Sequence, residues 1–520
     1  MSAATPQSLA HVTTIDAIPQ EGARERPDAT AFVLGERRIS FAQWEHCVAT
    51  SAVRLQEAGL RPGDRFVILG ENGIVLITLA LAAARAKAWP VILNARLSER
   101  EIETIAHHAQ PRLIAFANDI SPDAERHPGA FETEHVTFEG LPPFRLTVAA
   151  DCEPEPVHDD PARDVAAMIY TSGTTGAPKG VMLSHANLMH VARHSGYLRG
   201  LAPGERVYGC LPVSHVFGLA SMFLGSALYG ATNYLVPRFD PSEALRLLRD
   251  EELTVFQGVP AMFARLIEHA RQTGRPIEAP ALRYASAGGS PLDLALKTRV
   301  EAALGVSLHN GYGMTELSPT VSQTRMDAPR RDDATGPLLP GIEARTVDGE
   351  GAPLPAGEIG TLQVRGPTVM LGYYRNKELT DRVKSADGWF DTGDLARFGE
   401  DGALYIVGRA KDLIIRSGFN VYPEEIEGVI ASHPDVTLAA VVGRNVEGNE
   451  EVWAFVQLRP GADFDEREMR AFCAERMAPY KRPTRIIALP TLPASSTGKV
   501  QKAKLREEAA SIAVEQAEAV

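Results

Sequence analysis

Apolar and polar positions in the first two thirds of the chain alternate between helical spacing and short apolar runs. Leu97–Ala109 has helical spacing, and an apolar run follows at Arg112–Phe116. The same succession returns as a helix at Ala244–Leu248, a strand at Thr254–Gly258, a helix at Pro260–Ala270 and a strand at Arg283–Ala287. Because strands that alternate with helices usually lie parallel, the pattern predicts an α/β fold of layered, largely parallel sheets.

The longest apolar run, Ile74–Ala84, stops at Arg85. It falls well short of the roughly 20 residues that span a bilayer, so it predicts a buried helix. The first twenty residues show neither a basic segment nor an apolar one, which argues against a signal peptide. We therefore expect a cytoplasmic protein without stable membrane insertion. Residues Ser121–Asp160, rich in Pro, Asp and Glu, are expected to form a surface excursion.

The pattern changes near Gly336, where turn residues and short strands predict a β-rich subdomain. After Arg409 a mixed segment predicts a small α+β domain, with a lysine-bearing loop and a helical tail at its end. Its expected elements are the helix Pro423–Ser432, the strands Val436–Val442 and Glu451–Leu458, and the helix Asp465–Met477. We predict a large domain over residues 1–409 and a small, mobile domain over residues 410–520.

Composition supports this division and excludes some functions. A chain of 520 residues exceeds the roughly 250–300 at which one core stops growing. Its formal net charge of -13 argues against non-specific nucleic-acid binding, which needs a basic surface. The four cysteines follow no disulfide or zinc spacing, as is typical of a reducing cytosol. Both a monomer and a homodimer remain open.

The most specific segment is YTSGTTGAPKG, from Tyr170 to Gly180, which follows an apolar strand at Val165–Ile169. Glycines permit close backbone approach, hydroxyls donate to phosphate oxygens and Lys179 adds charge. A Walker A loop is excluded, since only Ala177 and Pro178 separate Gly176 from Lys179. Alone, such a loop could be a flexible turn.

Together with four later segments, it resembles the signatures of the adenylate-forming superfamily, which includes acyl-CoA synthetases, firefly luciferase and peptide-synthetase adenylation domains. The later segments are HNGYGMTEL (309–317), GWFDTGD (388–394), GRAKD (408–412) and PASSTGKVQK (493–502). The resemblance spans nearly the whole chain, and the order of its motifs argues against chance. It departs from the common pattern at AGGSPL (287–292) and at Asn310, both of which the resemblance places beside the adenine and acyl pockets.

The resemblance implies a nucleotide site for ATP and Mg²⁺. Its nucleotide-binding residues would be Thr171, Ser172, Gly173, Thr174, Thr175, Gly176, Lys179, Gly289, Ser290, Pro291, Asn310, Gly311, Tyr312, Gly313, Asp394 and Arg409. Tyr312 would stack on adenine, Thr315 would contact the α-phosphate, and Asp394 and Arg409 would bind ribose. Glu316, with Thr175, would hold Mg²⁺, which prefers oxygen ligands shared with phosphates.

The resemblance also implies a carboxylic acid substrate and two half-reactions at one site. Lys499 would stabilise charge while the acid displaces pyrophosphate from ATP. The small domain would then turn about Lys411 and bring Gly418, in SGFNVY, towards the thiol of coenzyme A. Coenzyme A is favoured over a carrier protein, the alternative acceptor, because no carrier module is attached.

The segment LPVSHVFG (211–218) resembles the acyl-pocket motif of the superfamily, which implies an acyl pocket there with the catalytic candidate His215 at its gate. Val216 and Phe217 follow where relatives that activate amino acids carry an aspartate, so an ammonium would be left unpaired. The expected lining adds Met222, Tyr284–Gly289 and Gly311–Met314. This apolar lining predicts a medium- or long-chain fatty acid, with a benzoate or hydroxycinnamate as the alternative.

Overall fold

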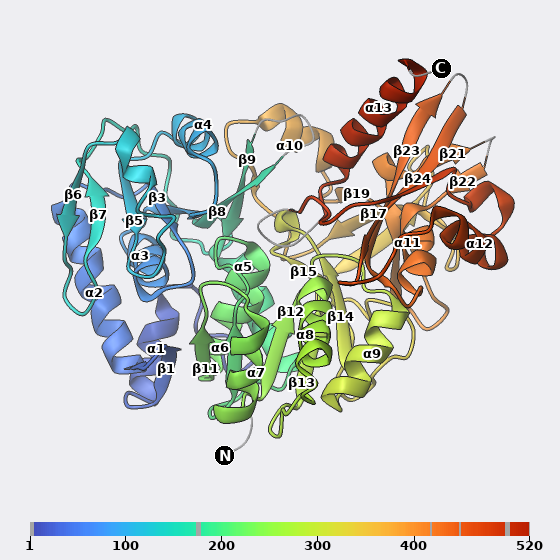
Figure 1. Ribbon diagram of the computed structural model, residues 1–520. Coiled ribbons are helices and arrows are strands. Elements are labelled where there is room, and N and C mark those ends of the chain that lie inside the picture. The colour runs from blue at the N-terminus through green and yellow to red at the C-terminus, as the bar shows by residue number, and fades with distance from the viewer. Residues whose placement is uncertain (1–4, 173–177, 417–418, 447–448, 495–499, 519–520) are drawn as a thin grey trace.

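The computed structural model describes residues 5–172, 178–416, 419–446, 449–494 and 500–518 (Figure 1). Two large sheets and a smaller antiparallel one form the large domain, and the small domain lies beside them. This is the predicted α/β class, with a large N-terminal and a small C-terminal domain. Within the described residues, none of the helices combines the length and the apolar character that crossing a bilayer requires.

The first large sheet has eight strands. Their order is β18 (Gly372–Tyr373), β9 (Pro178–Ser184), β8 (Val165–Ser172), β4 (Trp89–Asn94), β3 (Arg65–Gly70), β5 (Leu113–Ala117), β7 (Phe144–Thr147) and β6 (Thr133–Val136). Its helices are α2 (Phe41–Glu57), α3 (Ile74–Arg85) and α4 (Glu99–Ala109). Every residue of α3 before its last is buried, as the apolar run predicts.

Residues 121–160 are more than a surface excursion, because β6 and β7 lie within this segment. β7 pairs antiparallel with β5 and extends the first sheet. The charged composition concealed this pairing, which depends on two apolar side chains, Phe144 and Leu146, both buried.

The second large sheet also has eight strands. Their order is β15 (Thr320–Gln323), β14 (Leu308–Gly313), β13 (Tyr284–Ala287), β12 (Val255–Gly258), β10 (Arg206–Gly209), β11 (Thr232–Leu235), β1 (Thr30–Leu34) and β2 (Arg37–Ser40). Strands β14 to β1 are parallel, and the two edge strands are antiparallel. The predicted largely parallel arrangement is therefore confirmed here.

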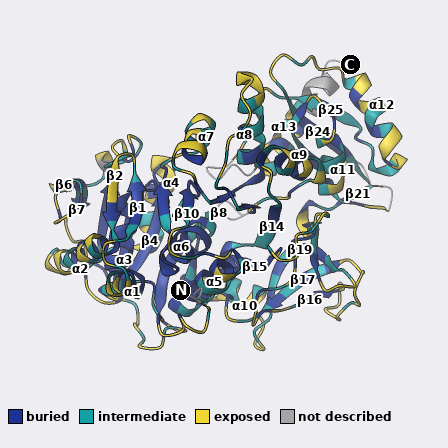
Figure 2. Ribbon diagram, turned by 90° about the horizontal axis from the view of Figure 1, so that it is seen from below, coloured by how far each residue is buried: buried dark blue, intermediate teal, exposed yellow. Residues whose placement is uncertain are grey.

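Helices cover both faces of this sheet, whose inner strands are largely buried whereas the edge strand β2 is largely exposed (Figure 2). One face packs against α7 (Pro241–Asp250), α8 (Pro260–Thr273) and α9 (Leu294–Leu304). The other packs against α5 (His185–Leu198), a π-helix (Phe217–Leu224) and α6 (Gly225–Leu228), and α1 (Ala17–Glu25) packs against α6. The π-helix begins at Phe217, within the LPVSHVFG segment. Such helices are rare in proteins, and those that occur are often found at functional sites.

The antiparallel sheet of the large domain has four strands, and α10 (Lys377–Val383) lies nearby. The strands are β16 (Glu343–Val347), β17 (Gly360–Arg365), β19 (Phe390–Phe398) and β20 (Leu404–Arg409). The small domain contains the β21–β22 hairpin (Ile414–Arg416, Phe419–Val421), strands β23 (Val436–Val446), β24 (Asn449–Leu458) and β25 (Arg485–Ala488), and helices α11 (Pro423–Ala431), α12 (Glu466–Arg476) and α13 (Lys502–Glu518). The predicted β-rich subdomain and the predicted small α+β domain are confirmed, whereas the exact boundary at residue 409 stays a prediction.

Candidate active site

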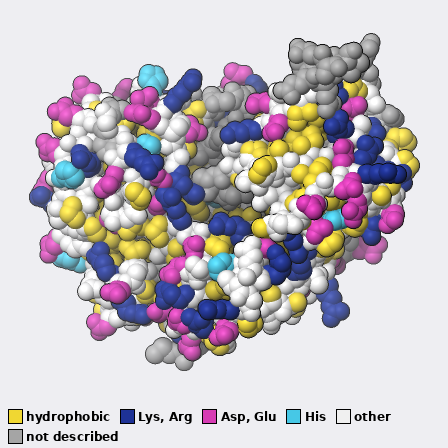
Figure 3. Space-filling model, in the orientation of Figure 1, with side chains coloured by type: hydrophobic (Ala, Val, Ile, Leu, Met, Phe, Trp, Pro, Cys, Tyr) yellow, Lys and Arg dark blue, Asp and Glu magenta, His cyan; other side chains and the backbone are white. Residues whose placement is uncertain are grey.

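Three structural units bring the predicted site residues together. The parallel strands of the second sheet end near the β8–β9 hairpin and near the β19–β20 hairpin. Ligands of α/β sheets commonly bind at the carboxyl ends of such strands. The surface is hollowed where the two halves of the molecule meet, and lysine and arginine side chains gather around the hollow (Figure 3).

The β8–β9 hairpin carries the two ends of the predicted phosphate loop. Its register places Thr171 opposite Lys179. Lys179 Nζ lies 5.4 Å from the ring centroid of Tyr373, in cation–π range. Gly173, Thr174, Thr175 and Gly176 lie outside the described residues, and Ser172 is described only as part of β8. At the described end of the loop, the Lys179 ammonium is therefore held against the Tyr373 ring.

Tyr373 in turn orients Glu316. The Tyr373 hydroxyl donates to Glu316 Oε1 at 2.9 Å, and the Met370 N–H donates to the Glu316 carbonyl, also at 2.9 Å. Both Glu316 and Thr315 are buried. Burial, reinforced by the neighbouring Glu316, raises the pKa of the Tyr373 hydroxyl well above its usual value, so it stays a donor at physiological pH. Glu316 is therefore a fixed carboxylate beside the hairpin lysine.

Asp394 and Arg409 face each other across the β19–β20 ladder. Arg409 Nε lies 2.7 Å from Asp394 Oδ1, and the Tyr312 hydroxyl donates to Asp394 Oδ2 at 2.5 Å. Burial, reinforced by Asp394, raises the pKa of the Tyr312 hydroxyl. Burial opposes the charge of Arg409, but Asp394 and the acidic groups around it together outweigh burial and raise the Arg409 pKa. The predicted adenine-side tyrosine and the predicted ribose-side pair are thus one hydrogen-bonded unit.

Asn310 braces its own segment. Its amide nitrogen donates to the carbonyls of Asp333 at 3.0 Å and Ala334 at 3.4 Å, while its amide oxygen accepts from the Gly311 N–H at 3.0 Å. Because both ends of the carboxamide are engaged and Asn310 is buried, its side chain holds the strand against the loop at Asp333 and Ala334. The predicted nucleotide contact of Asn310 stays a prediction, and the second lone pair of its amide oxygen is the side-chain group that could make it.

Gly313 is required by the backbone. A Cβ on Gly313 would lie 1.7 Å from the carbonyl oxygen of Pro319, so no other residue fits without moving the chain. The Met314 N–H donates to the same Pro319 carbonyl at 3.0 Å. This tight return places Thr315 and Glu316 directly after β14.

The expected acyl pocket is bordered by the π-helix and by the end of β13. A Cβ on Gly288 would lie 3.2 Å from Cζ of Phe217, so the phenyl ring lies almost against the glycine. His215 is half-buried, and its Nδ1 accepts from the Phe217 N–H at 3.3 Å. Gly289 is exposed with a positive φ of 81°, followed by Ser290 and Pro291. The wall therefore combines a small residue with an aromatic ring.

Lys411 lies in the short 3₁₀ helix Ala410–Asp412 that follows β20. Burial lowers the pKa of Lys411, and the neighbouring Asp412 opposes that effect. Asp412 Oδ1 accepts from Arg506 of α13 at 2.5 Å, which ties the connection to the small domain. Gly418 and Lys499 lie outside the described residues.

The described residues do not enclose a metal on their own. Among them, no group of three or more His, Cys, Asp or Glu side chains could hold an ion. A single fixed carboxylate, Glu316, suits Mg²⁺, which commonly uses one or two carboxylates and otherwise phosphates and water.

Sequence reasoning missed Tyr373 and the partners of Asn310. Tyr373 lies in the run GYYRN, which carries no chemical signature by itself. Asp333 and Ala334 act through backbone carbonyls, which no sequence pattern identifies.

The chain belongs to the AMP-binding enzyme family, the adenylate-forming class that the motifs predict. Residues 19–374 match the AMP-binding enzyme family and residues 425–499 match its C-terminal domain.

Three similar proteins illustrate the range of the family. A 2-succinylbenzoate–CoA ligase of Bacillus licheniformis is 34% identical over 92% of this chain and 97% of its own. A long-chain-fatty-acid–CoA ligase of Bacillus subtilis is 29% identical over 95% and 94%. The structure of an o-succinylbenzoate coenzyme A synthetase from Bacillus subtilis, in complex with ATP and magnesium, is 26% identical and has a TM-score of 0.78 over 93% of this chain and 98% of that one.

Proposed function

We propose that the protein is an AMP-forming acid–CoA ligase that uses ATP, Mg²⁺ and coenzyme A. The observation that supports it best is the convergence of Lys179, Glu316 and the Asp394–Arg409 pair. Family membership over both domains and the names of the relatives support the same activity.

In the first half-reaction, a carboxylate oxygen of the acid attacks the α-phosphorus of ATP. The bond to the bridging oxygen breaks, and pyrophosphate leaves with its electron pair, so an acyl-adenylate forms. Asp394 accepts hydrogen bonds from the ribose hydroxyls in this proposal, with Arg409 and Tyr312 fixing its two oxygens. Lys179 and Lys499 supply positive charge where negative charge develops, which is commonly the largest catalytic term.

Glu316 would hold Mg²⁺ through Oε2, since the Tyr373 hydroxyl binds Oε1. A bound Mg²⁺ neutralises phosphate charge and orients the leaving pyrophosphate. In the second half-reaction the thiolate of coenzyme A attacks the acyl carbonyl carbon, and AMP leaves. Gly418 is proposed as the close backbone contact of the thiol arm after rotation about Lys411.

The proposed acid is a medium- or long-chain fatty acid. The described residues after His215, Val216 and Phe217, offer no carboxylate for a substrate ammonium, and the buried Met222 adds apolar lining. The fatty-acid relative has the same substrate class in its name.

An aromatic acid is the second candidate. It is favoured by the Phe217 ring, which lies edge to Gly288 and would stack on a planar substrate, and by the succinylbenzoate relative. The two candidate functions use the same adenylation and thioester chemistry, and they differ only in the acid that the acyl pocket accepts.

The test is product formation from a panel of octanoate, palmitate, benzoate and 4-hydroxycinnamate with ATP and Mg²⁺, with and without coenzyme A. We expect the acyl-CoA thioester and AMP in stoichiometric amounts from one class of acid. Adenylate that accumulates without consumption of coenzyme A would instead indicate a carrier protein as the acceptor. Absence of AMP with every acid would contradict the proposed ligase.

A further inference from the structure

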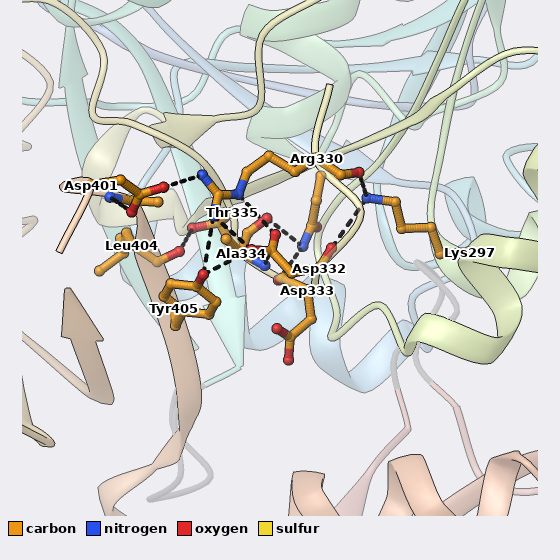
Figure 4. Close-up of polar contacts among 11 residues, drawn as sticks. Lys297, Arg330, Asp332, Asp333, Ala334, Thr335, Asp401, Leu404 and Tyr405 are labelled. Carbon is orange, nitrogen blue, oxygen red and sulfur yellow. Dashed lines mark hydrogen bonds and ion pairs between the residues drawn. The ribbon is translucent and has the colours of Figure 1, made fainter. Parts of the chain in front are cut away.

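A network of charged and polar side chains connects α9, the loop between β15 and β16, and the β19–β20 hairpin (Figure 4). It consists of Lys297, Arg330, Asp332, Asp401 and Tyr405, which we call the Arg330 bracket. Arg330 and Asp332 lie in the loop between β15 and β16, Lys297 lies on α9, and Asp401 and Tyr405 belong to the β19–β20 hairpin. None of these residues belongs to the motifs that predict the reaction.

Arg330 is the centre of the bracket. Its guanidinium binds Asp332 with two hydrogen bonds, Nε to Oδ1 at 2.8 Å and Nη2 to Oδ2 at 2.6 Å. Its other nitrogen, Nη1, donates to Asp401 Oδ2 at 2.6 Å, and Nη2 also lies 3.1 Å from the Tyr405 hydroxyl. Tyr405 donates its hydroxyl to Asp332 Oδ2 at 2.8 Å, which closes the ring of contacts. Bidentate arginine–carboxylate pairs of this kind fix geometry as well as supplying energy.

The backbone of the same loop connects to β14. Lys297 is only 3% exposed, and its ammonium donates to the carbonyls of Arg330 at 2.5 Å and Asp332 at 3.1 Å. The next two carbonyls, those of Asp333 and Ala334, accept from the amide of Asn310. Because the loop is held from both sides, its carbonyls are fixed where Asn310 requires them.

The other end of the bracket reaches the hairpin that carries the Asp394–Arg409 pair. Thr335 donates its N–H to the Leu404 carbonyl at 2.8 Å, and Leu404 donates its N–H to the Gly336 carbonyl at 3.0 Å. Tyr405 follows Leu404 on β20, the same strand that ends at Arg409. The loop therefore joins the strand bearing Asn310 and Tyr312 to the strand bearing Arg409.

We propose that the Arg330 bracket is a positioning device that sets nucleotide affinity by fixing the β19–β20 hairpin relative to β14. Tyr312 lies on β14 and its partner Asp394 lies on β19, so the two halves of the nucleotide site come from separate units of the fold. This proposal rests on the proposed nucleotide role of those residues. Loss of the bracket lets the hairpin shift, which weakens binding of ATP and AMP without touching the groups that react.

The expected effect is selective. Removing one member of a coupled polar network typically changes affinity through interactions that are not additive, and a roughly tenfold loss in ATP and AMP affinity is expected for Arg330→Met. The turnover number at saturating ATP and the KM for the acid should stay within about twofold, since an interaction made equally in ground and transition states affects binding alone.

The same loop offers a matched control. Arg325 binds Asp327 at the same two-residue spacing and with the same bidentate geometry, Nε to Oδ1 at 2.9 Å and Nη2 to Oδ2 at 2.7 Å. Within the described part of the chain, the hydrogen bonds and the ion pair of Arg325 and Asp327 join these two residues to each other and not to the β19–β20 hairpin. Arg325→Met therefore removes an equivalent ion pair without cutting the connection.

The experiment measures AMP affinity by calorimetry and the KM values for ATP and acid in the full-length parent, Arg330→Met, Arg325→Met and Tyr405→Phe. Tyr405→Phe removes one hydroxyl and keeps the ring, so it tests the bracket if Arg330→Met folds poorly. Weaker AMP binding and a higher KM for ATP in the two bracket variants, but not in Arg325→Met, support the proposal.

Two results would overturn it. If Tyr405→Phe and Arg330→Met bind AMP as the parent does, or if their KM for acid and turnover number change as much as the KM for ATP, the bracket has no positioning role for the nucleotide. If the parent itself neither binds AMP nor turns over ATP, the proposed function fails and the bracket proposal fails with it.

Discussion

Arg409 Nε lies 2.7 Å from Asp394 Oδ1, and the two residues are direct cross-strand neighbours on β19 and β20. The pair depends on one register of one hairpin, because a slip of either strand by one residue would put the two side chains on opposite faces of the sheet. Tyr312 takes the other oxygen of Asp394, which leaves the carboxylate fixed by two donors from different units of the fold.

Asp394→Ala is expected to abolish nucleotide binding and to destabilise the large domain. Arg409 would lose its charged partner, and a hydrogen bond to a charged group contributes about 1.5–3 kcal/mol. The measurement is AMP affinity by calorimetry together with thermal unfolding. Asp391→Ala is the control, because Asp391 accepts from the Gly393 N–H in the same segment without contacting Arg409 in the contacts described. AMP binding by Asp394→Ala at the parent's affinity would contradict the ribose role.

Tyr373→Phe is expected to raise the Mg²⁺ concentration needed for half-maximal activity. Glu316 loses the donor that orients it, and one such hydrogen bond is worth about 1 kcal/mol, or roughly a fivefold change. The measurement is a Mg²⁺ titration at fixed ATP. Tyr374→Phe is the matched control, since its hydroxyl donates to Glu155 rather than to Glu316. Identical titrations for the two variants would show that Glu316 does not depend on Tyr373.

Gly288→Ala is expected to narrow the acyl pocket. The new methyl group would lie 3.2 Å from Cζ of Phe217, closer than an unstrained contact, so one of the two must shift into the pocket. One methylene group in an apolar pocket changes the ratio of kcat/KM between two substrates by about 10- to 200-fold. The loss in kcat/KM of the variant should therefore grow with the bulk of the acid. The second change Phe217→Leu should restore the bulkier substrates. An unchanged acid profile in both variants would place the acyl group elsewhere.

Asp119→Asn is expected to stabilise the protein at neutral pH. Burial raises the pKa of the Asp119 carboxyl from 3.8 to about 6, despite opposing contributions from a backbone N–H of Val75 and from Arg37. Between these values the folded state holds a proton that the unfolded state has released, so stability falls as pH rises from about 4 to 6. The asparagine variant does not ionise there, so its melting temperature should gain on the parent's over that interval. A difference that stays constant from pH 4 to 7 would contradict the assigned burial.

Much of the fold could be predicted because its elements have strong local patterns. The run Ile74–Ala84 is a buried helix, and the predicted strand Arg283–Ala287 corresponds to β13 at Tyr284–Ala287. The β6–β7 extension was missed, since its strands are short and lie in a charged segment with few apolar positions. The local sequence pattern was therefore enough to predict a helix or strand where apolar residues recur at regular spacing.

The candidate site was predictable where function depends on a motif and not where it depends on packing. The motifs predicted that Asp394 and Arg409 share a site, and the structure brings them into contact; their ribose role stays a prediction. Tyr373 acts on Glu316 and Arg330 acts on Tyr405, both far away in the sequence, and no spacing rule connects such pairs. Asn310 shows the converse, because its side chain serves the backbone of the loop.

The most direct test of the two-step ligase compares its half-reactions in the parent and in Lys499→Ala. One assay follows acid-dependent pyrophosphate release from ATP, and the other follows thioester formation from a preformed acyl-adenylate and coenzyme A. The ligase account predicts that Lys499→Ala slows the first assay about 10²- to 10³-fold and leaves the second within a few fold. Equal losses in both assays, or pyrophosphate release in the variant at the parent's rate, would contradict it.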